Sequence, residues 1–395
     1  VTTKPVVTVG RFTSPDTMAS QIKRGVVDFI GAARPSIADP FLPKKIEEGR
    51  PEDIRECIGC NICYTGDGLG VPIRCTQNPT MGEEWRRGWH PEFIAKKGSE
   101  SSVLVVGAGP AGLEATRALG QRGYRVTLAE ATRELGGRVT RESRLPGLTE
   151  WQRVRDYRLQ QIDVMPNVEV FRESELNVDE VLAVEADHIV FATGAAWRAD
   201  GFGRSHLHPL TALSPGARIL TPDDIMAGHL PDGPTVIFDD DSFYMGGVIA
   251  EQVRRANVPV SVVTPENVVS AWCEYTSEQY QVQKHLLELG IEVKTAHSLL
   301  AYDGREVTIS CIHTGGQQSI KADALIMVTA RLPRDELYQD LNRRLESGVQ
   351  TPFRSVRRIG DCEAPAIIAA AVHSGHRYAR ELDTEPDPDV PLRLE

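Results

Sequence analysis

A strand, a glycine-rich turn and a helix follow one another from residue 102, and this succession constrains the fold more than any other feature. The apolar run at 102–106 leads into Gly-Ala-Gly-Pro-Ala-Gly at 107–112, and a second predicted strand, 124–129, ends before Glu130. The three glycines permit a tight turn, close approach of a pyrophosphate to the helix N-terminus, and close helix–strand packing. An acidic residue at the end of the second strand accepts hydrogen bonds from a ribose. The pattern predicts an α/β fold with an adenine-nucleotide site formed by Gly107, Gly109, Gly112 and Glu130.

Three later segments fit the same kind of domain, in the order that two-domain flavoproteins show. Gly136, Gly137 and Arg138 are placed to close over the pyrophosphate, and 188–194 is a predicted strand ending in a small-residue turn. The segment 359–361, Ile-Gly-Asp, then precedes a predicted helix. Each segment alone is more simply an ordinary turn, because glycine after a strand is common. Their order predicts a split Rossmann-like domain over residues 99–230 and 355–395.

A second strand–helix unit, within residues 231–354, lacks the glycine-rich turn. The strand at 235–238 is followed by three aspartates, 239–241, and then by Phe243 and Tyr244. Carboxylates repel a pyrophosphate, and bulky side chains block its approach to the backbone. The sequence therefore predicts a second Rossmann-like domain without a functional nucleotide turn. An acidic surface loop is the alternative interpretation, and it has the same consequence for function.

Four cysteines in residues 51–98 are spaced C-x2-C-x2-C-x11-C. Three thiolates at this spacing can hold one side of a cubane cluster while a fourth arrives from beyond a glycine-containing excursion. The predicted metal ligands are Cys57, Cys60, Cys63 and Cys75, and the predicted occupant is a [4Fe-4S] cluster. A structural zinc site is the alternative, although zinc sites usually combine two C-x2-C pairs. Disulfides are disfavoured, because the seven cysteines are odd in number and no signal peptide opens the chain, so we expect a reducing, cytoplasmic setting.

The N-terminal residues 1–50 alternate between strand and helix patterns, at 5–10, 14–25, 28–33 and 39–48. Such alternation is typical of βα units in a parallel sheet. Both strands end in a small residue followed by arginine, Gly10-Arg11 and Ala33-Arg34, as in the phosphate site after the last two strands of a TIM barrel. Two ordinary βα turns are the alternative. Two units cannot close a barrel, so we expect the other six on a separate polypeptide or on a longer form of this chain.

Composition and charge narrow the classes of partner. The 395 residues, 41% hydrophobic, suffice for two or three domains, and no apolar run is long enough to cross a bilayer, so we expect no membrane partner. The formal net charge of −11 argues against a nucleic-acid partner, which requires a basic face. Small molecules and other proteins remain.

With these segments in view, the chain resembles the C-terminal half of the trimethylamine dehydrogenase family, which includes dimethylamine and histamine dehydrogenases. The resemblance runs through essentially the whole chain. Its most specific segments are residues 33–43, the cysteine array, residues 86–92, and Gly360-Asp361 with residues 363–365. The resemblance implies a fold with the last two βα units of an FMN-binding TIM barrel, a [4Fe-4S] segment and two Rossmann-like domains. It also implies ADP where relatives hold FAD.

The resemblance further implies a function and the roles of single residues. Members oxidise a small amine at FMN and pass single electrons through the cluster to an electron-transferring flavoprotein, as homodimers of the complete unit. Gly10, Arg11, Ala33 and Arg34 match the flavin phosphate end, the four cysteines match the cluster ligands, and the fingerprint residues match the ADP site. The covalent flavin link and the residues that bind substrate and handle protons lie in the N-terminal half, so no catalytic residue is assigned in this chain.

Two alternatives remain open. The 2,4-dienoyl-CoA reductase class shares the architecture but uses NADPH, and its cluster spacing resembles C-x2-C-x3-C-x11-C, one residue longer than the spacing here. A non-catalytic electron-transfer subunit that docks on a separate flavin barrel is the other. We interpret His90, His373 and His376 as packing or surface residues, and Tyr157 either as part of a docking surface or as a core aromatic.

Overall fold

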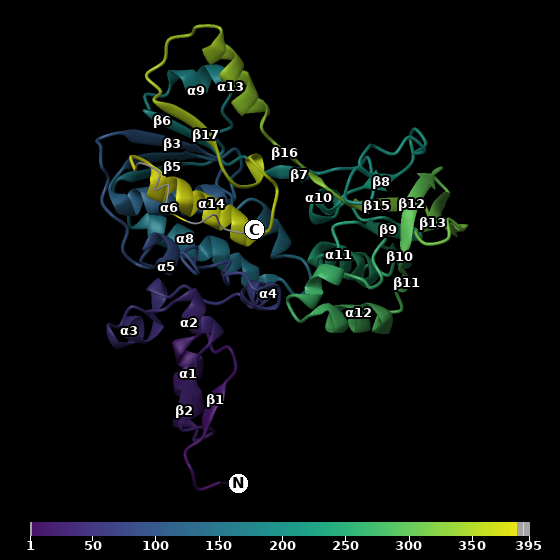
Figure 1. The fold of residues 1–395 in the computed structure, drawn as a ribbon, viewed down its shortest axis with the longest axis horizontal. Coiled ribbons are helices and arrows are strands. Elements are labelled where there is room, and N and C mark those ends of the chain that lie inside the picture. The colour runs from purple at the N-terminus through teal and green to yellow at the C-terminus, as the bar shows by residue number, and fades with distance from the viewer. Residues whose placement is uncertain (1, 385–389, 391–395) are drawn as a thin grey trace. The chain divides into compact units, whose positions relative to one another are not determined.

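A computed structural model describes residues 2–384 and residue 390 (Figure 1). The chain forms two compact units. The first comprises residues up to 140, 150–194 and those from 334 onward, and the second comprises 141–149 and 195–333. In the described part of the chain, no helix combines the length and apolar character that a bilayer crossing requires.

The first unit is built on a five-stranded parallel sheet in the order β17-β6-β3-β4-β5. Its strands are β3 (Ser102–Val106), β4 (Arg125–Ala129), β5 (Val168–Phe171), β6 (His188–Phe191) and β17 (Ser355–Arg358). Every residue of β3 is buried, as expected for a parallel strand that is covered on both faces. This sheet confirms the α/β fold that the glycine-rich turn predicts.

Helices cover the two faces of this sheet (Figure 1). Val103 and Val105 pack toward α6 (Pro110–Arg122), α8 (Arg153–Asp163) and α14 (Ile368–Glu381). Leu104 and Val106 pack toward α9 (Val178–Ala183) and α13 (Glu336–Glu346) on the other face. Alternate side chains of β3 thus point to opposite faces of the sheet and contribute to two apolar cores.

The N-terminal segment holds two short parallel strands and three helices. They are β1 (Val7–Val9), α1 (Pro15–Lys23), β2 (Phe29–Gly31), α2 (Arg34–Ala38) and α3 (Leu42–Glu47). The helix predicted at 39–48 is present as the shorter α3, and the sequence pattern missed α2, which lies directly before the predicted range. Pro35 and Pro43 each occupy the first turn of a helix, which is the position proline favours. Val7, Val9 and Phe29 are more than half exposed, so this strand pair does not bury its own apolar side chains.

The cysteine-containing segment has little regular structure. It holds η1 (Pro51–Asp53), α4 (Ile62–Leu69) and α5 (Glu84–Arg87). After β4 the chain forms α7 (Arg138–Glu142) and η2 (Thr149–Gln152), and η4 (Gly360–Cys362) precedes α14. Backbone turns and side-chain hydrogen bonds together hold the chain between these elements.

The second unit contains another five-stranded parallel sheet, in the order β11-β10-β9-β15-β8. The strands are β8 (Ile219–Leu220), β9 (Thr235–Asp239), β10 (Val260–Val263), β11 (Glu292–Lys294) and β15 (Ala324–Val328). An antiparallel sheet of β12 (His297–Tyr302), β13 (Glu306–Cys311) and β14 (Gln317–Lys321) packs on it through one shared core. The other elements are β7 (Ala195–Trp197), α10 (Pro222–Met226), α11 (Tyr244–Arg255), η3 (Ala271–Glu274), α12 (Gln279–Glu288) and β16 (Arg331–Pro333).

Apart from residues 141–149, which belong to the second unit, the two compact units divide the chain at 194/195 and 333/334. The domains predicted from sequence divide it at 230/231 and 354/355. Two elements account for the difference. The two-residue strand β8 pairs with β15 and so brings the residues before 231 to the second sheet. Helix α13 shares a core with α9 and so belongs to the first unit.

Candidate metal and nucleotide sites

The four cysteines of the spaced array border a single cavity in the first unit. The lining also includes Ile37, Ile58, Arg34, Asn61, Thr76 and Gln77. Gly59 and Asn61 both have positive φ, 73° and 54°, and these two left-handed residues bend the chain between successive cysteines. Local backbone geometry therefore turns the C-x2-C-x2-C triplet toward one point, and Cys75 reaches the same cavity from the far side of α4.

Burial dominates the electrostatics of these thiols. It raises the pKa of Cys60 to about 11 and that of Cys75 to about 12. The Thr76 hydroxyl lies 3.1 Å from the Cys60 sulfur, and the backbone N–H groups of Gln77 and Asn78 lie at the Cys75 sulfur, where they oppose the rise. Thiols in such surroundings ionise when a bound metal supplies the compensating positive charge.

The donor set of this cavity fits an iron–sulfur cluster. Its lining brings four thiols together. A cubane attaches each thiolate to a different iron atom, whereas zinc draws all its ligands onto one centre. All seven cysteines are free thiols, and no disulfide competes for the array.

Two arginines predicted at a flavin phosphate contact the cysteine loop. Arg34 donates a hydrogen bond from Nη1 to the Asn61 side-chain oxygen, and its guanidinium lies 5.9 Å from the Tyr64 ring centre. Arg11 donates from Nη1 to the Cys57 carbonyl at 3.4 Å. Gly10 follows β1 directly, and Ala33 precedes α2, so both small residues lie at the carboxyl ends of the paired strands. The predicted phosphate residues are therefore gathered at one edge and joined to the cysteine loop.

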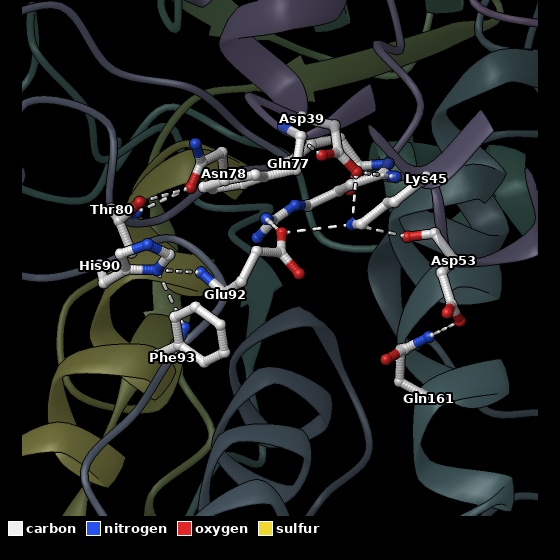
Figure 2. Close-up of polar contacts among 12 residues, drawn as sticks. Asp39, Lys45, Asp53, Gln77, Asn78, Thr80, His90, Glu92, Phe93 and Gln161 are labelled. Carbon is white, nitrogen blue, oxygen red and sulfur yellow. Dashed lines mark hydrogen bonds and ion pairs between the residues drawn. The ribbon is translucent and has the colours of Figure 1, made fainter. Parts of the chain in front are cut away.

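A buried charged cluster beside this loop was not predicted from sequence. Figure 2 shows Lys45 between Asp39 and Glu92, with Nζ–carboxylate distances of 2.7 and 3.2 Å. Arg55 also reaches Glu92, at 3.1 Å, and Lys45 donates to the Asp53 carbonyl. These ion pairs join the N-terminal segment to the cysteine segment. Asp39 and Glu92 lie in the segments that carry the family resemblance, which is the signal that could have drawn attention to them.

The nucleotide turn has the geometry that its glycines predict. Gly107 has φ of 102°, and a Cβ there would lie 2.6 Å from the Ala192 carbonyl oxygen. A Cβ at Gly112 would lie 1.9 Å from the Gly107 carbonyl oxygen, whereas one at Gly109 would meet nothing within 4 Å. Gly109 is the N-cap of α6, so the space beside it faces a helix N-terminus. This is where a pyrophosphate binds in such folds.

The later segments converge on the same turn. A Cβ at Gly137 would lie 3.1 Å from the Gly109 Cα, so the Gly136–Gly137 loop lies against the nucleotide turn. Arg138 Nη1 is 2.7 Å from the Asp361 carboxylate and donates to the Ala366 carbonyl at 2.9 Å. One cation thus connects two segments that are more than two hundred residues apart in the sequence. The sequence suggests that both segments belong to this domain, but it does not reveal their pairing.

Glu130 is held rigidly at the end of β4. Its Oε2 accepts from the Ala108 N–H at 2.8 Å, and its Oε1 accepts from the Thr132 N–H and hydroxyl at 2.9 and 2.8 Å. A fixed carboxylate with lone pairs to spare is suited to bind ribose hydroxyls. A cavity of about 400 Å³ adjoins the loop that follows, lined by Arg133, Glu134, Leu135, Arg155, Leu159 and Arg172.

The corresponding turn in the second unit is filled by its own side chain. Asp239 is fully buried, and its Oδ2 lies 2.3 Å from where a Cβ on Gly246 of α11 would be. Asp239 Oδ1 accepts from the Ser242 N–H at 3.0 Å, and burial, with Asp241 and Asp240 nearby, raises the Asp239 pKa to about 8. The interpretation of an acidic surface loop is wrong for Asp239 and Asp240, since both are buried.

The three histidines contact neighbouring protein groups, and His373 also lines a small cavity together with Cys75. His376 is fully buried with Nδ1 2.8 Å from Glu114, and burial lowers its pKa to about 4. His373 lies 3.2 Å from Glu83, and His90 accepts from the N–H groups of residues 92 and 93. Tyr157 is 9% exposed, so it is a core aromatic and not part of a docking surface.

Comparisons with known protein families match two parts of the chain. Residues 1–53 match the NADH:flavin oxidoreductase / NADH oxidase family, and residues 101–210 match the pyridine nucleotide-disulphide oxidoreductases. The fold and these matches define the class: a flavoprotein oxidoreductase in which the tail of an FMN-type barrel precedes Rossmann-like sheets.

Individual relatives define the family. Dimethylamine dehydrogenase of Hyphomicrobium sp. (strain x) is 40% identical over 426 aligned residues, which cover 100% of this chain and 57% of that protein. The structure of histamine dehydrogenase from Rhizobium sp. 4-9 is 53% identical, with a TM-score of 0.95, over 99% of this chain and 57% of that one. The structure of 6-hydroxypseudooxynicotine amine oxidase from Pseudomonas geniculata N1 is 47% identical, with a TM-score of 0.93, over 97% and 57%.

The chain therefore belongs to the trimethylamine, dimethylamine and histamine dehydrogenase family, and it corresponds to the C-terminal portion of its members. It spans 57% of the length of each of these relatives.

Proposed function

We propose that this chain is the electron-relay and nucleotide-binding portion of an iron–sulfur flavoprotein amine dehydrogenase. Cys57, Cys60, Cys63 and Cys75 hold a [4Fe-4S] cluster, which supplies one-electron transfer when bound. The observation that carries this proposal is the single cavity bordered by all four thiols, in a chain 40–53% identical to amine dehydrogenases and an amine oxidase.

The chain's own residues hold the cluster, shield it from water and stabilise its charge. Ile58 and Ile62 are buried beside the cysteines and exclude water from the sulfurs. The Thr76 hydroxyl and the N–H groups of Gln77 and Asn78 donate toward sulfur and so stabilise added negative charge. Gly10, Arg11, Ala33 and Arg34 form the chain's share of an FMN phosphate site, and the rest of that site belongs to the N-terminal barrel half, on the same or another chain.

The nucleotide site of the first unit is proposed to hold ADP in a structural role. Gly107 and Gly112 allow the tight turn and the close packing of α6, and Gly109 leaves room for the pyrophosphate. Gly137 closes over the pyrophosphate, and Glu130 binds the ribose. Arg138, which follows this glycine loop, is ion-paired with Asp361. ADP is proposed over FAD because the family resemblance implies it. Asp239 closes the corresponding turn of the second unit, and this supports an acceptor other than NADPH.

The complete enzyme would oxidise a small amine at FMN and reduce an electron-transferring flavoprotein, in the cytoplasm and as a homodimer. An acceptor protein is required because the second unit offers no open nucleotide turn for NADPH. This inference separates the amine dehydrogenase from the 2,4-dienoyl-CoA reductase class.

Two experiments on the anaerobically purified complete protein test the proposal. Denaturation should release about one ADP per chain, as identified by chromatography; stoichiometric FAD would overturn the ADP assignment, and tight NADPH binding would favour the reductase. Cys60→Ala should lose the visible absorbance of the cluster and the transfer to acceptor while flavin reduction by amine persists. A Cys60→Ala protein with a full iron complement would refute the ligand assignment.

A further inference from the structure

Gln77 lines the cavity bordered by the four thiols. All the polar atoms of its side chain form hydrogen bonds with protein groups. Its side chain is 1% exposed. Its Nε2 donates to the Glu56 carbonyl at 3.0 Å and to the Arg153 carbonyl at 3.2 Å. Its Oε1 accepts from Arg158 Nη1 at 3.1 Å, and its backbone carbonyl accepts from Arg158 Nη2 at 3.2 Å. Both ends of the side-chain amide are therefore satisfied by protein groups.

These contacts connect the first and last cysteines of the array. Glu56 immediately precedes Cys57, so the Nε2 bond fixes the start of the cysteine triplet. Gln77 lies two residues after Cys75, and its backbone N–H lies at the Cys75 sulfur. A single residue thus sets the separation between the two chain segments that border the cavity, and it orients a donor toward one sulfur.

The anchor behind Gln77 is itself rigid. Arg158 of α8 is fully buried and also donates to the Val154 carbonyl at 2.7 Å. Its Nε is 2.8 Å from a carboxylate oxygen of Glu114 on α6, and Arg117 lies 2.6 Å from the other oxygen of that carboxylate. A buried guanidinium held on several sides has few alternative positions, so it can transmit the rigidity of the helices to the cysteine loop.

We propose that Gln77 is a positioning residue for the iron–sulfur cluster, which holds Cys57 and Cys75 at cluster-binding separation and directs a backbone N–H to the Cys75 sulfur. This inference rests on the proposed function, because it requires the cysteines to bind a cluster. Hydrogen bonds to cluster sulfurs stabilise the reduced form, and the groups that orient metal ligands affect affinity. Gln77 therefore influences both the retention of the cluster and its midpoint potential.

The test is Gln77→Met in the anaerobically prepared complete protein. Methionine fills a similar volume but makes none of the amide contacts. We expect iron to be retained about 10-fold to 100-fold less tightly against a chelator, the range typical for loss of residues that orient metal ligands. We also expect a lower midpoint potential in an EPR-monitored redox titration.

Gln77→Glu is the second variant, and it keeps the acceptor for Arg158 if methionine impairs folding. It loses both donations to the carbonyls of Glu56 and Arg153, so iron retention should again fall. Asn167→Ala is the matched control, since the Asn167 amide also donates to two carbonyls, those of Gly120 and Tyr124 at 2.9 and 2.6 Å, without bordering the cysteine cavity. This control should keep the parent potential and iron retention.

The outcomes separate this inference from the proposed function. A parent protein without iron would overturn both. A parent protein with a full cluster, together with Gln77 variants of unchanged potential and iron retention, would overturn the positioning role alone. A loss shared equally by Asn167→Ala would show a general effect of stability and would also overturn it.

Discussion

The turns after β3 and after β9 both join a strand to a helix, but they are formed by different residues. Both follow a fully buried central strand of a five-stranded parallel sheet, and both lead into a helix of about twelve residues. After β3, glycine leaves space at the helix N-terminus. At the end of β9, the Asp239 carboxyl group packs against Gly246, the third residue of α11, and the N-cap of that helix is Phe243. The turn after β3 is therefore open at its glycine N-cap, whereas the turn after β9 is closed by larger side chains, although the strand–turn–helix arrangement is the same.

The largest expected effect comes from Gly112→Ala in the open turn. The new Cβ would lie 1.9 Å from the Gly107 carbonyl oxygen, so helix α6 must move away from the strand. We expect loss of bound nucleotide and a stability loss of about 1–3 kcal/mol or more, as for overpacked cores. Thermal unfolding and analysis of released nucleotide check both. A variant that keeps its nucleotide and melting temperature would contradict the close packing inferred for this turn.

Gly109→Ala should separate binding from folding at the same turn. A Cβ at 109 meets no protein atom within 4 Å, so the fold should tolerate it with a change below about 1 kcal/mol. The methyl group would project into the space proposed for the pyrophosphate, so nucleotide should be lost. Retention of stoichiometric nucleotide would show that the ligand does not bind at this helix N-terminus.

In the closed turn, the Asp239 carboxyl makes stability depend on pH. Burial raises its folded pKa to about 8, so the folded state binds the proton more tightly than the unfolded state. Its contribution is fully present below the unfolded pKa of about 3.9 and is lost as pH rises toward 8. Asparagine cannot ionise, so Asp239→Asn should not show this pH-dependent decrease in the free energy of unfolding. At pH 8 we expect the variant to be more stable than the parent by about a few kcal/mol.

Thermal unfolding of Asp239→Asn at pH 5 and pH 8 measures this effect, with the exposed Asp163→Asn as the control. The melting temperatures of the two variants should differ clearly at pH 8 and much less at pH 5. An Asp239→Asn protein with the parent's pH dependence would show that Asp239 ionises as freely as an exposed carboxyl group.

The smallest expected effect is that of Glu130→Gln. The amide keeps the shape but loses the negative charge and one of the two oxygens that accept from Ala108 and Thr132. Hydrogen bonds to charged groups contribute about 1.5–3 kcal/mol. We expect ADP binding to weaken by about tenfold or somewhat more, measured by calorimetry on nucleotide-free protein. Unchanged affinity would place the ribose away from β4.

The sequence predicts the parts of these sites that local spacing determines. The glycines at 107–112 and the cysteine triplet act within a single turn, so their geometry follows from the residues themselves. The contacts between distant residues do not follow in this way. Arg34 with Asn61, Arg138 with Asp361 and Arg158 with Gln77 depend on the packing of separate elements, and no periodicity marks such pairs.

Strand β8 shows the same limit in the fold. A two-residue strand has too little pattern to be recognised, yet its pairing with β15 decides which unit its neighbours join. The second turn shows the reverse case. The aspartates at 239–241 mark the loss of the nucleotide turn, but only the structure shows that Asp239 is buried against α11.

The most direct test of the central claim is native mass spectrometry of the anaerobically prepared protein, combined with iron and sulfide analysis. The account predicts one cluster mass per chain, with about four iron and four sulfide ions, and its loss in Cys60→Ala. The account would be contradicted if the folded, nucleotide-loaded chain carried the mass of one zinc ion. It would also be contradicted if that chain carried no metal.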